Sequence, residues 1–100
     1  MDSPLADRFG ANLRCARRNA DLSQEGLALL VELSRSDVSQ LECGLRLPRL
    51  DTIIKLSAGV AVSPCVLLAG LNWQPGYYVE GQFHAIRETE TSVPAEGSAQ

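Results

Sequence analysis

The chain of 100 residues has few of the features that support a disulfide scaffold, a zinc site or a membrane anchor. Its three cysteines, Cys15, Cys43 and Cys65, are odd in number and include no Cys-x-x-Cys pair, which argues against a disulfide framework and a metal centre. No apolar run approaches the roughly 20 residues of a membrane-spanning helix. This cysteine usage is typical of a reducing compartment. We expect a cytoplasmic protein in which Cys15 and Cys65 are buried and Cys43 is exposed.

Signals for catalysis are also scarce. His84 is the only histidine, no motif places a nucleophile beside a base, and there is no glycine-rich phosphate loop. Residues 1–4 lack the basic segment and the apolar core of a secretory signal. We therefore expect a protein that is not an enzyme, carries no cofactor or metal, and is not exported.

The net charge of −3 is unevenly distributed. Residues 71–100 contain one arginine and four glutamates, which account for the whole deficit, whereas residues 1–70 are neutral. Within residues 8–49, seven arginines outnumber five acidic residues. This local excess of positive charge can attract a phosphate backbone, and we expect weak non-specific binding that is sensitive to salt.

The most informative segment, residues 23–44, contains two short helical patterns separated by residues 32–34. Each pattern opens with a serine, Ser23 or Ser34, whose hydroxyl can accept a hydrogen bond from a free amide of the first helical turn. Apolar residues recur at helical spacing, so each helix has one face that can close on a common core. The outward positions of the second helix are Arg35, Ser36, Ser39 and Gln40. These polar groups can hydrogen-bond base edges or phosphates.

With its flanks, this segment resembles the helix-turn-helix domains of phage repressors and Cro-like (XRE-type) proteins. Upstream, Leu13, Ala16 and Arg17 match the family's first helix; downstream, Gly44 and Pro48 precede a Thr-Ile-Ile-Lys-Leu stretch and a Val-Ser-Pro helix start. The resemblance covers residues 6–70. It implies an all-α fold, a compact five-helix lambda-repressor-like DNA-binding domain with a short C-terminal extended or β appendage. The expected helices are 6–20, 24–31, 35–42, 51–60 and 64–68.

The same resemblance implies which residues contact DNA. The second helix would bond a phosphate and brace the recognition helix through Gln24, while Arg35, Ser36 and Gln40 would reach base edges in the major groove. The region after the recognition helix would clamp the backbone through the amide of Gly44 with Arg46 or Arg49. The full set of expected DNA-binding residues is Gln24, Ser34, Arg35, Ser36, Ser39, Gln40, Gly44, Arg46 and Arg49.

Three further expectations concern charged residues. The family pairs an arginine late in its first helix with a glutamate that ends the third, which implies an ion pair between Arg17 and Glu42. We expect Asp37 to complete a capping box with Ser34 at the start of the recognition helix. Arg14 and Arg18 lie four residues apart on one helix face, where a solvated surface and a phosphate contact both remain open.

The segment departs from the family pattern at two places. The turn between the two helices usually carries glycine in the left-handed conformation, and Glu32 occupies that place at a cost on the order of 1 kcal/mol. The helix before it carries Leu29 and Leu30 where the family has polar residues. Because the inner face is already filled, we expect one of these two leucines to be exposed.

The chain changes character after residue 70. We expect a helix-turn-helix domain over 1–70, an aromatic extension over 71–87, and a disordered polar tail over 88–100. Residues 77–86 have extended character. The extension either packs across a two-fold axis onto a second subunit or forms a lid over the fifth helix, and we favour the first arrangement. The aromatic residues assigned to this dimerisation arm are Trp73, Tyr77, Tyr78 and Phe83.

Together these features predict a sequence-specific DNA-binding transcriptional regulator, a dimeric repressor that recognises the major groove with helix 35–42. The expected partners are an operator in double-stranded DNA and a second copy of the chain. Two alternatives stay open. One is the antitoxin of a toxin–antitoxin pair, which would add a toxin as protein partner, and the other is a restriction–modification controller protein.

Overall fold

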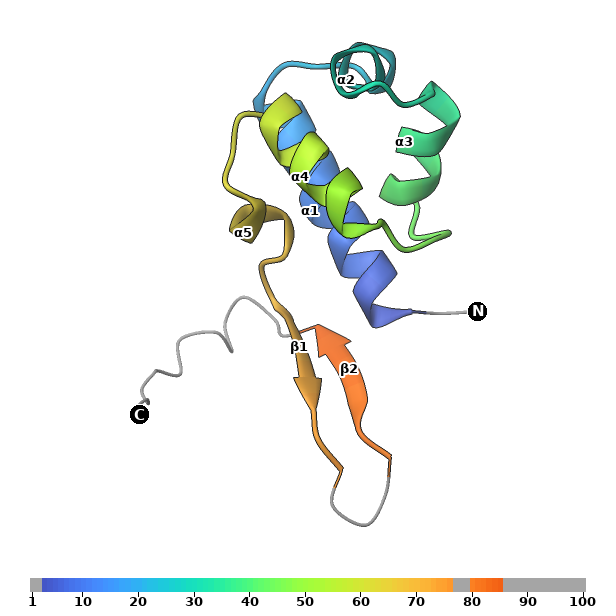
Figure 1. The fold of residues 1–100 in the computed structure, drawn as a ribbon, viewed down its shortest axis with the longest axis vertical. Coiled ribbons are helices and arrows are strands. Elements are labelled where there is room, and N and C mark those ends of the chain that lie inside the picture. The colour runs from blue at the N-terminus through green and yellow to red at the C-terminus, as the bar shows by residue number, and fades with distance from the viewer. Residues whose placement is uncertain (1–2, 77–79, 86–100) are drawn as a thin grey trace.

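The computed structural model describes residues 3–76 and 80–85 and confirms the expected five-helix fold (Figure 1). None of the helices in these residues is both long and apolar enough to cross a membrane. The expected disordered tail, and Tyr77 and Tyr78 of the aromatic extension, lie outside the described residues. The elements are α1 (Pro4–Asn19), α2 (Gln24–Val31), α3 (Arg35–Glu42), α4 (Leu50–Gly59), α5 (Pro64–Leu67), β1 (Leu71–Gln74) and β2 (Gln82–Ala85).

Serine residues begin four of the five described helices. The hydroxyl oxygens of Ser3, Ser23, Ser34 and Ser63 accept hydrogen bonds from amides two or three residues later. Each of these bonds satisfies an amide that has no partner inside its helix. The exception is α4, which follows Arg49 without a side-chain cap. These local signals explain why the helix ends agree with the expected ones to within two residues.

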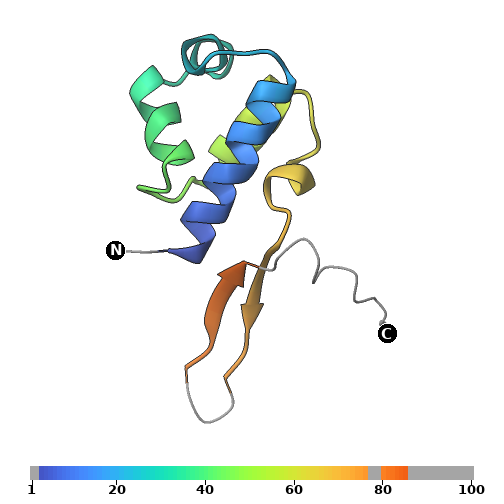
Figure 2. The same cartoon turned by 180° about the vertical axis from the view of Figure 1, so that it is seen from behind.

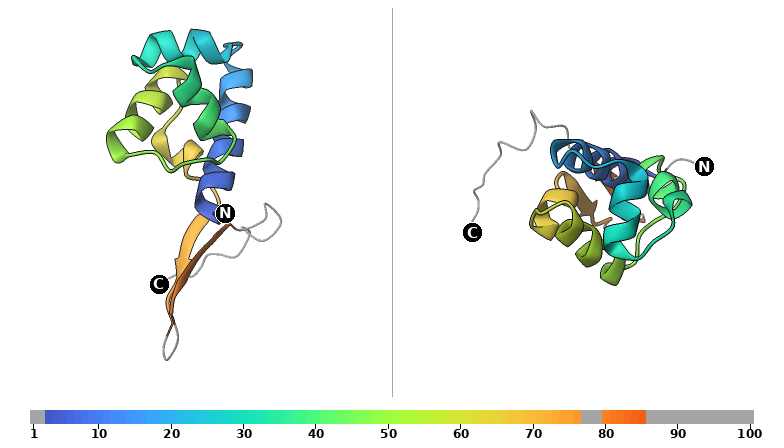
Figure 3. Two further views of the ribbon diagram at one scale, coloured as in Figure 1. Left: turned by 90° about the vertical axis from the view of Figure 1, so that its right-hand side faces the viewer. Right: turned by 90° about the horizontal axis from the view of Figure 1, so that it is seen from above.

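The helices close around one apolar core. α3 contacts α1 and α2, α4 contacts α2 and α5, and α5 contacts α1, so every described helix packs against at least two others. In the view from above, the helices gather around a common centre (Figure 3). The fully buried large side chains are Phe9, Leu13, Leu27, Val38, Leu41, Leu56 and Leu67.

The aromatic extension folds as an antiparallel hairpin, in which Leu71 pairs with Ala85 and Trp73 with Phe83. The hairpin projects away from the helices at the end of the domain opposite α2 (Figures 1 and 2). Its main helical neighbour is α1. Extended structure is expected over 77–86; the structure describes 80–85 of this range, and 82–85 form β2. The described part of the hairpin does not form a lid over α5.

Two expectations about exposure are wrong. All three cysteines are exposed, including Cys15 and Cys65, and both Leu29 and Leu30 are exposed rather than one of them. The buried stripe of α1 contains Leu13 and Ala16, and Cys15 falls outside it. α5 has a single turn that buries only its last residue, and the buried face of α2 consists of Leu27, Ala28 and Val31.

The turn between α2 and α3 has the left-handed geometry that the family builds with glycine. Glu32 has φ 60° and ψ 41°, so the strain of a β-carbon in this conformation is tolerated rather than avoided. We expect Glu32→Gly to raise the free energy of unfolding by about 0.5–1 kcal/mol, because the relief of strain exceeds the extra chain entropy of glycine. Thermal unfolding measures the change. Glu25→Gly, an exposed control in the first turn of α2, should instead lose about 1 kcal/mol, and equal losses in the two variants would contradict the assignment.

Candidate nucleic-acid interface

The start of α3 presents an exposed polar surface on a rigid base. The Ser34 hydroxyl accepts a hydrogen bond from the Asp37 amide, and an Asp37 carboxylate oxygen accepts one from the Ser34 amide, both at 3.0 Å. This capping box was expected, and it leaves Arg35 and Ser36 exposed beside it. Ser39 and Gln40 follow on α3 and are half-buried. A guanidinium, hydroxyls and an amide in this order supply both donors and acceptors for base edges.

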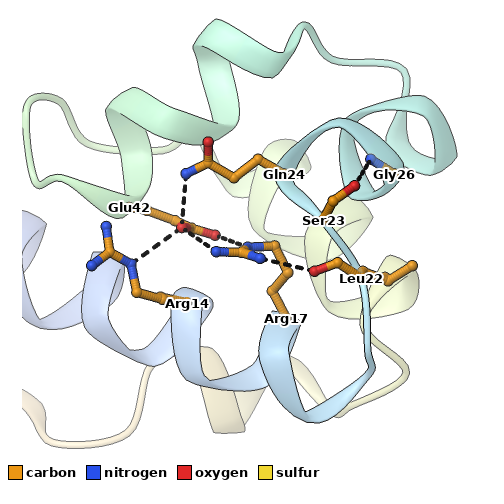
Figure 4. Close-up of polar contacts among 7 residues, drawn as sticks. All are labelled: Arg14, Arg17, Leu22, Ser23, Gln24, Gly26 and Glu42. Atoms are coloured by element: carbon orange, nitrogen blue, oxygen red, sulfur yellow. Dashed lines mark hydrogen bonds and ion pairs between the residues drawn. The ribbon is translucent and has the colours of Figure 1, made fainter.

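The far end of α3 is held by a buried carboxylate, Glu42, that collects hydrogen bonds from two other helices (Figure 4). Arg17 of α1 donates from Nε to one oxygen at 2.5 Å and from Nη2 to the other at 3.0 Å. Arg14 donates from Nε at 3.3 Å, and Gln24 of α2 donates from Nε2 at 3.1 Å. The expected ion pair between Arg17 and Glu42 is therefore present, and it is part of a larger network that fixes α3 to both α1 and α2.

The network also determines the charge of its members. Burial by itself would raise the pKa of Glu42, but the hydrogen bonds from Arg17 and Gln24 and the attraction of Arg17 outweigh it, so this pKa lies below its ordinary value. The hydrogen bond to Glu42 raises the pKa of Arg17 in turn. Both residues are thus ionised in the folded protein. Arg17 also donates from Nη1 to the carbonyl oxygen of Leu22 at 2.8 Å, which ties the α1–α2 connection to the same group.

This arrangement changes the interpretation of two expected residues. Gln24 braces α3, as the resemblance implied, and it uses one amide hydrogen for this purpose, which leaves the second for a phosphate. Arg14 and Arg18 are not equivalent, because Arg14 is paired with Glu42 and Arg18 is exposed. The role of Arg14 was missed, although its position one helical turn before Arg17 places both on the same face of α1.

The loop after α3 carries two arginines with different surroundings. Arg46 donates from Nη2 to Asp37 at 3.0 Å, so the loop is tied to the first turn of α3. Hydrogen bonds from the Ser34 backbone and hydroxyl, with a contribution from Arg46, lower the pKa of Asp37. Arg49 lies 3.5 Å from Asp51 and is largely exposed. The loop begins at Gly44, which follows α3 with φ +74°, the left-handed conformation in which glycine commonly ends a helix.

The remaining expected residues separate into two groups. Trp73 and Phe83 of the dimerisation arm lie together on the hairpin, about 49% exposed each. The hairpin projects from the end of the domain opposite α2 (Figure 1). Tyr77 and Tyr78 are outside the described residues. Within residues 3–76 and 80–85, no group of three or more histidine, cysteine, aspartate or glutamate side chains is placed to hold a metal ion.

Comparison with known proteins supports the helix-turn-helix fold. A family model described as a helix-turn-helix domain matches residues 8–69, and a search of curated proteins gave no match. The restriction–modification controller protein C.AhdI from Aeromonas hydrophila is 42% identical over 60% of this chain and 91% of its own, with a TM-score of 0.58. A hypothetical transcription factor, NHTF, from Neisseria is 34% identical over 64% of this chain and 74% of its own, with a TM-score of 0.61. The P22 c2 repressor protein, solved in complex with synthetic operator 9T, is 28% identical over 60% of this chain and 91% of its own, with a TM-score of 0.57.

Proposed function

The chain belongs to the helix-turn-helix domain family, and from this premise we propose that it is a sequence-specific DNA-binding regulator of transcription that acts as a dimeric repressor. The observation that carries the proposal is the exposed polar start of α3 on a base held by Glu42. A helix supported in this way can enter the major groove without changing its angle to the rest of the domain, because α1 and α2 both bond its far end.

Each expected DNA contact has a definite chemistry. The guanidinium of Arg35 suits the two acceptors of guanine, and the amide of Gln40 suits adenine. Phosphates would be bound by the free amide hydrogen of Gln24, the backbone amide of Gly44 and the guanidinium of Arg46 or Arg49. Ser36 and Ser39 supply hydroxyls that can hydrogen-bond base edges or phosphates. Ser34 supports the surface through its cap rather than through a free hydroxyl.

The first test is a quantitative binding titration on a duplex selected from random sequence. Arg35→Ala is expected to lose about 1–3 kcal/mol of binding free energy and to relax the preference at one base position. Arg46→Ala should weaken binding to all sequences alike and reduce the salt slope by about 1. Lys55→Ala, an exposed cation on α4, is the matched control and should bind like the wild type. Equal affinities of the wild type and Arg35→Ala for the selected duplex would remove Arg35 from the base contacts.

A restriction–modification controller is the second candidate, because the 42% identity to C.AhdI is a specific observation in its favour. The antitoxin alternative has no comparable support among these structures. Footprinting on the promoters of the chain's own gene and of its neighbours distinguishes the candidates: a controller protects the promoter of a restriction or modification gene.

A further inference from the structure

The hairpin has one apolar face. Because side chains alternate along a strand, Trp73 and Phe83 share a face with Leu71 and Ala85. The residues between these two pairs, Asn72 and His84, face the other side of the hairpin. The two aromatic rings meet edge to face with centroids 4.8 Å apart. Gly81 leaves room for the indole ring of Trp73, since a β-carbon there would collide with that ring. We call Trp73 and Phe83 the aromatic knob.

An apolar groove of about 220 Å³ lies at the base of the hairpin. Its walls come from distant parts of the chain, α1, the loop after α3, α4 and the end of α5, and include Leu5, Phe9, Leu47, Pro48 and Leu68. Leu47 and Leu68 are 54% and 39% exposed. The first residue of β1, Leu71, also lines the groove and shares a strand face with Trp73, so the groove and the knob are neighbours.

Both surfaces remain partly exposed within the subunit. A two-stranded hairpin is marginally stable in water unless its apolar face is covered. The half-exposed knob leaves roughly 200 Å² of aromatic surface in contact with water, whereas a stable interface takes about 800 Å² from each partner. Contact between two knobs alone is therefore too small. The knob and the groove together come closer to the required area, and both are lined by hydrocarbon.

We propose that the hairpin is an exchanged arm, and that the aromatic knob of one copy docks in the apolar groove of a second copy, reciprocally across a two-fold axis. The proposal rests on the dimeric regulator proposed above and specifies how that dimer forms. In a two-fold dimer, each contact between knob and groove occurs twice. The hairpin leaves the domain at the end opposite α2, so this docking leaves α2 and the start of α3 free to meet DNA (Figure 1).

The exchange is tested by complementation in the full chain. A knob variant, Trp73→Ser with Phe83→Ser, and a groove variant, Leu68→Glu, each disrupt the docking at both symmetry-related sites of their own homodimer. Sedimentation equilibrium should show the dimer dissociation constant raised at least ~30-fold in each. In an equimolar mixture, the knob of the groove variant can dock in the groove of the knob variant. The heterodimer therefore keeps one of the two contacts, and the mixture should again form dimers. Leu29→Ser, a 77% exposed leucine on α2, is the control and should dimerise like the wild type.

The exchanged arm is overturned if the wild type is monomeric at roughly 100 μM, if either variant stays dimeric, or if the mixture stays monomeric. Circular dichroism melts establish that each variant is folded. Titration of the wild type on the selected duplex separates this result from the proposed function. If the wild type binds the duplex but the knob variant still dimerises, the exchanged arm is refuted and the regulator is not. A dimer that behaves as expected but binds no duplex refutes the regulator and leaves the arm intact.

Discussion

Arg17→Met is expected to lower the free energy of unfolding by about 3 kcal/mol, the lower end of the cost of breaking a buried ion pair. The substitution leaves the fully buried carboxylate of Glu42 without its closest cation. The loss stays at the lower end because Arg14 and Gln24 still donate to the same carboxylate. Chemical denaturation measured by circular dichroism gives the value.

A double-mutant cycle separates the pair from its surroundings. Glu42→Leu strands the guanidinium of Arg17, whereas the double variant replaces both charges by apolar groups and should recover part of the loss. Arg46→Met breaks the exposed pair with Asp37 and serves as the control, with a loss below about 1 kcal/mol. If the losses of Arg17→Met and Glu42→Leu simply add, the two residues are not coupled.

The same network predicts an acid dependence. The pKa of Glu42 is lower in the folded chain than its ordinary value of 4.5, so the folded state favours the ionised carboxylate. This stabilisation is complete above the unfolded pKa and is lost as the pH falls through the folded one. The wild type should therefore lose more stability than Glu42→Gln between neutral pH and about pH 3. Parallel pH profiles for the two proteins would show that Glu42 does not carry the effect.

The second large effect is expected at Gly10, where the backbone of α1 lies against the end of α3. A β-carbon at this position would lie 2.5 Å from the carbonyl oxygens of both Leu41 and Glu42. These are backbone atoms, so Gly10→Ala must push the two helices apart. Alanine gains about 1 kcal/mol of helix propensity, but overpacking against two carbonyls costs more, and we expect a net loss of about 2–3 kcal/mol.

The matched control is Gly26→Ala in α2. Its nearest obstacle is the side-chain oxygen of Ser23 at 3.2 Å, which accepts a hydrogen bond from the Gly26 amide and needs to shift by only a few tenths of an ångström, so the free energy of unfolding should change by less than about 1 kcal/mol. Because Leu41 and Glu42 end the recognition helix, Gly10→Ala should also weaken duplex binding at temperatures where it is folded. A Gly10→Ala protein as stable as the wild type would mean that the helices separate without cost.

The chain's own sequence was sufficient to predict the helices and the caps at their starts. The start of α3 illustrates why: Ser34 and Asp37 cap the helix within one turn, and their chemistry needs no other part of the chain. The ion pair of Arg17 with Glu42 was predicted by resemblance alone. Gly10 was overlooked, although a glycine inside a helix is itself a weak signal of close packing.

The tertiary structure decided which single side chains are exposed and which groups they contact. Whether Cys15 or Leu30 faces solvent depends on how the neighbouring helices cover α1 and α2, and periodicity gives the buried stripe without its width. The local sequence does not distinguish Arg14 from Arg18. They differ because Arg14 donates a hydrogen bond to Glu42, which lies 28 positions further along the chain.

The sequence by itself determined the family, the helix boundaries and the polar outward row of α3, because caps, turns and apolar spacing act over a few residues. The tertiary structure decided that Glu42 binds three side chains and that Arg46 is tied to Asp37. It also brought the walls of the apolar groove together beside the hairpin. These features join residues that are distant along the chain, and their geometry exists only after the helices have packed.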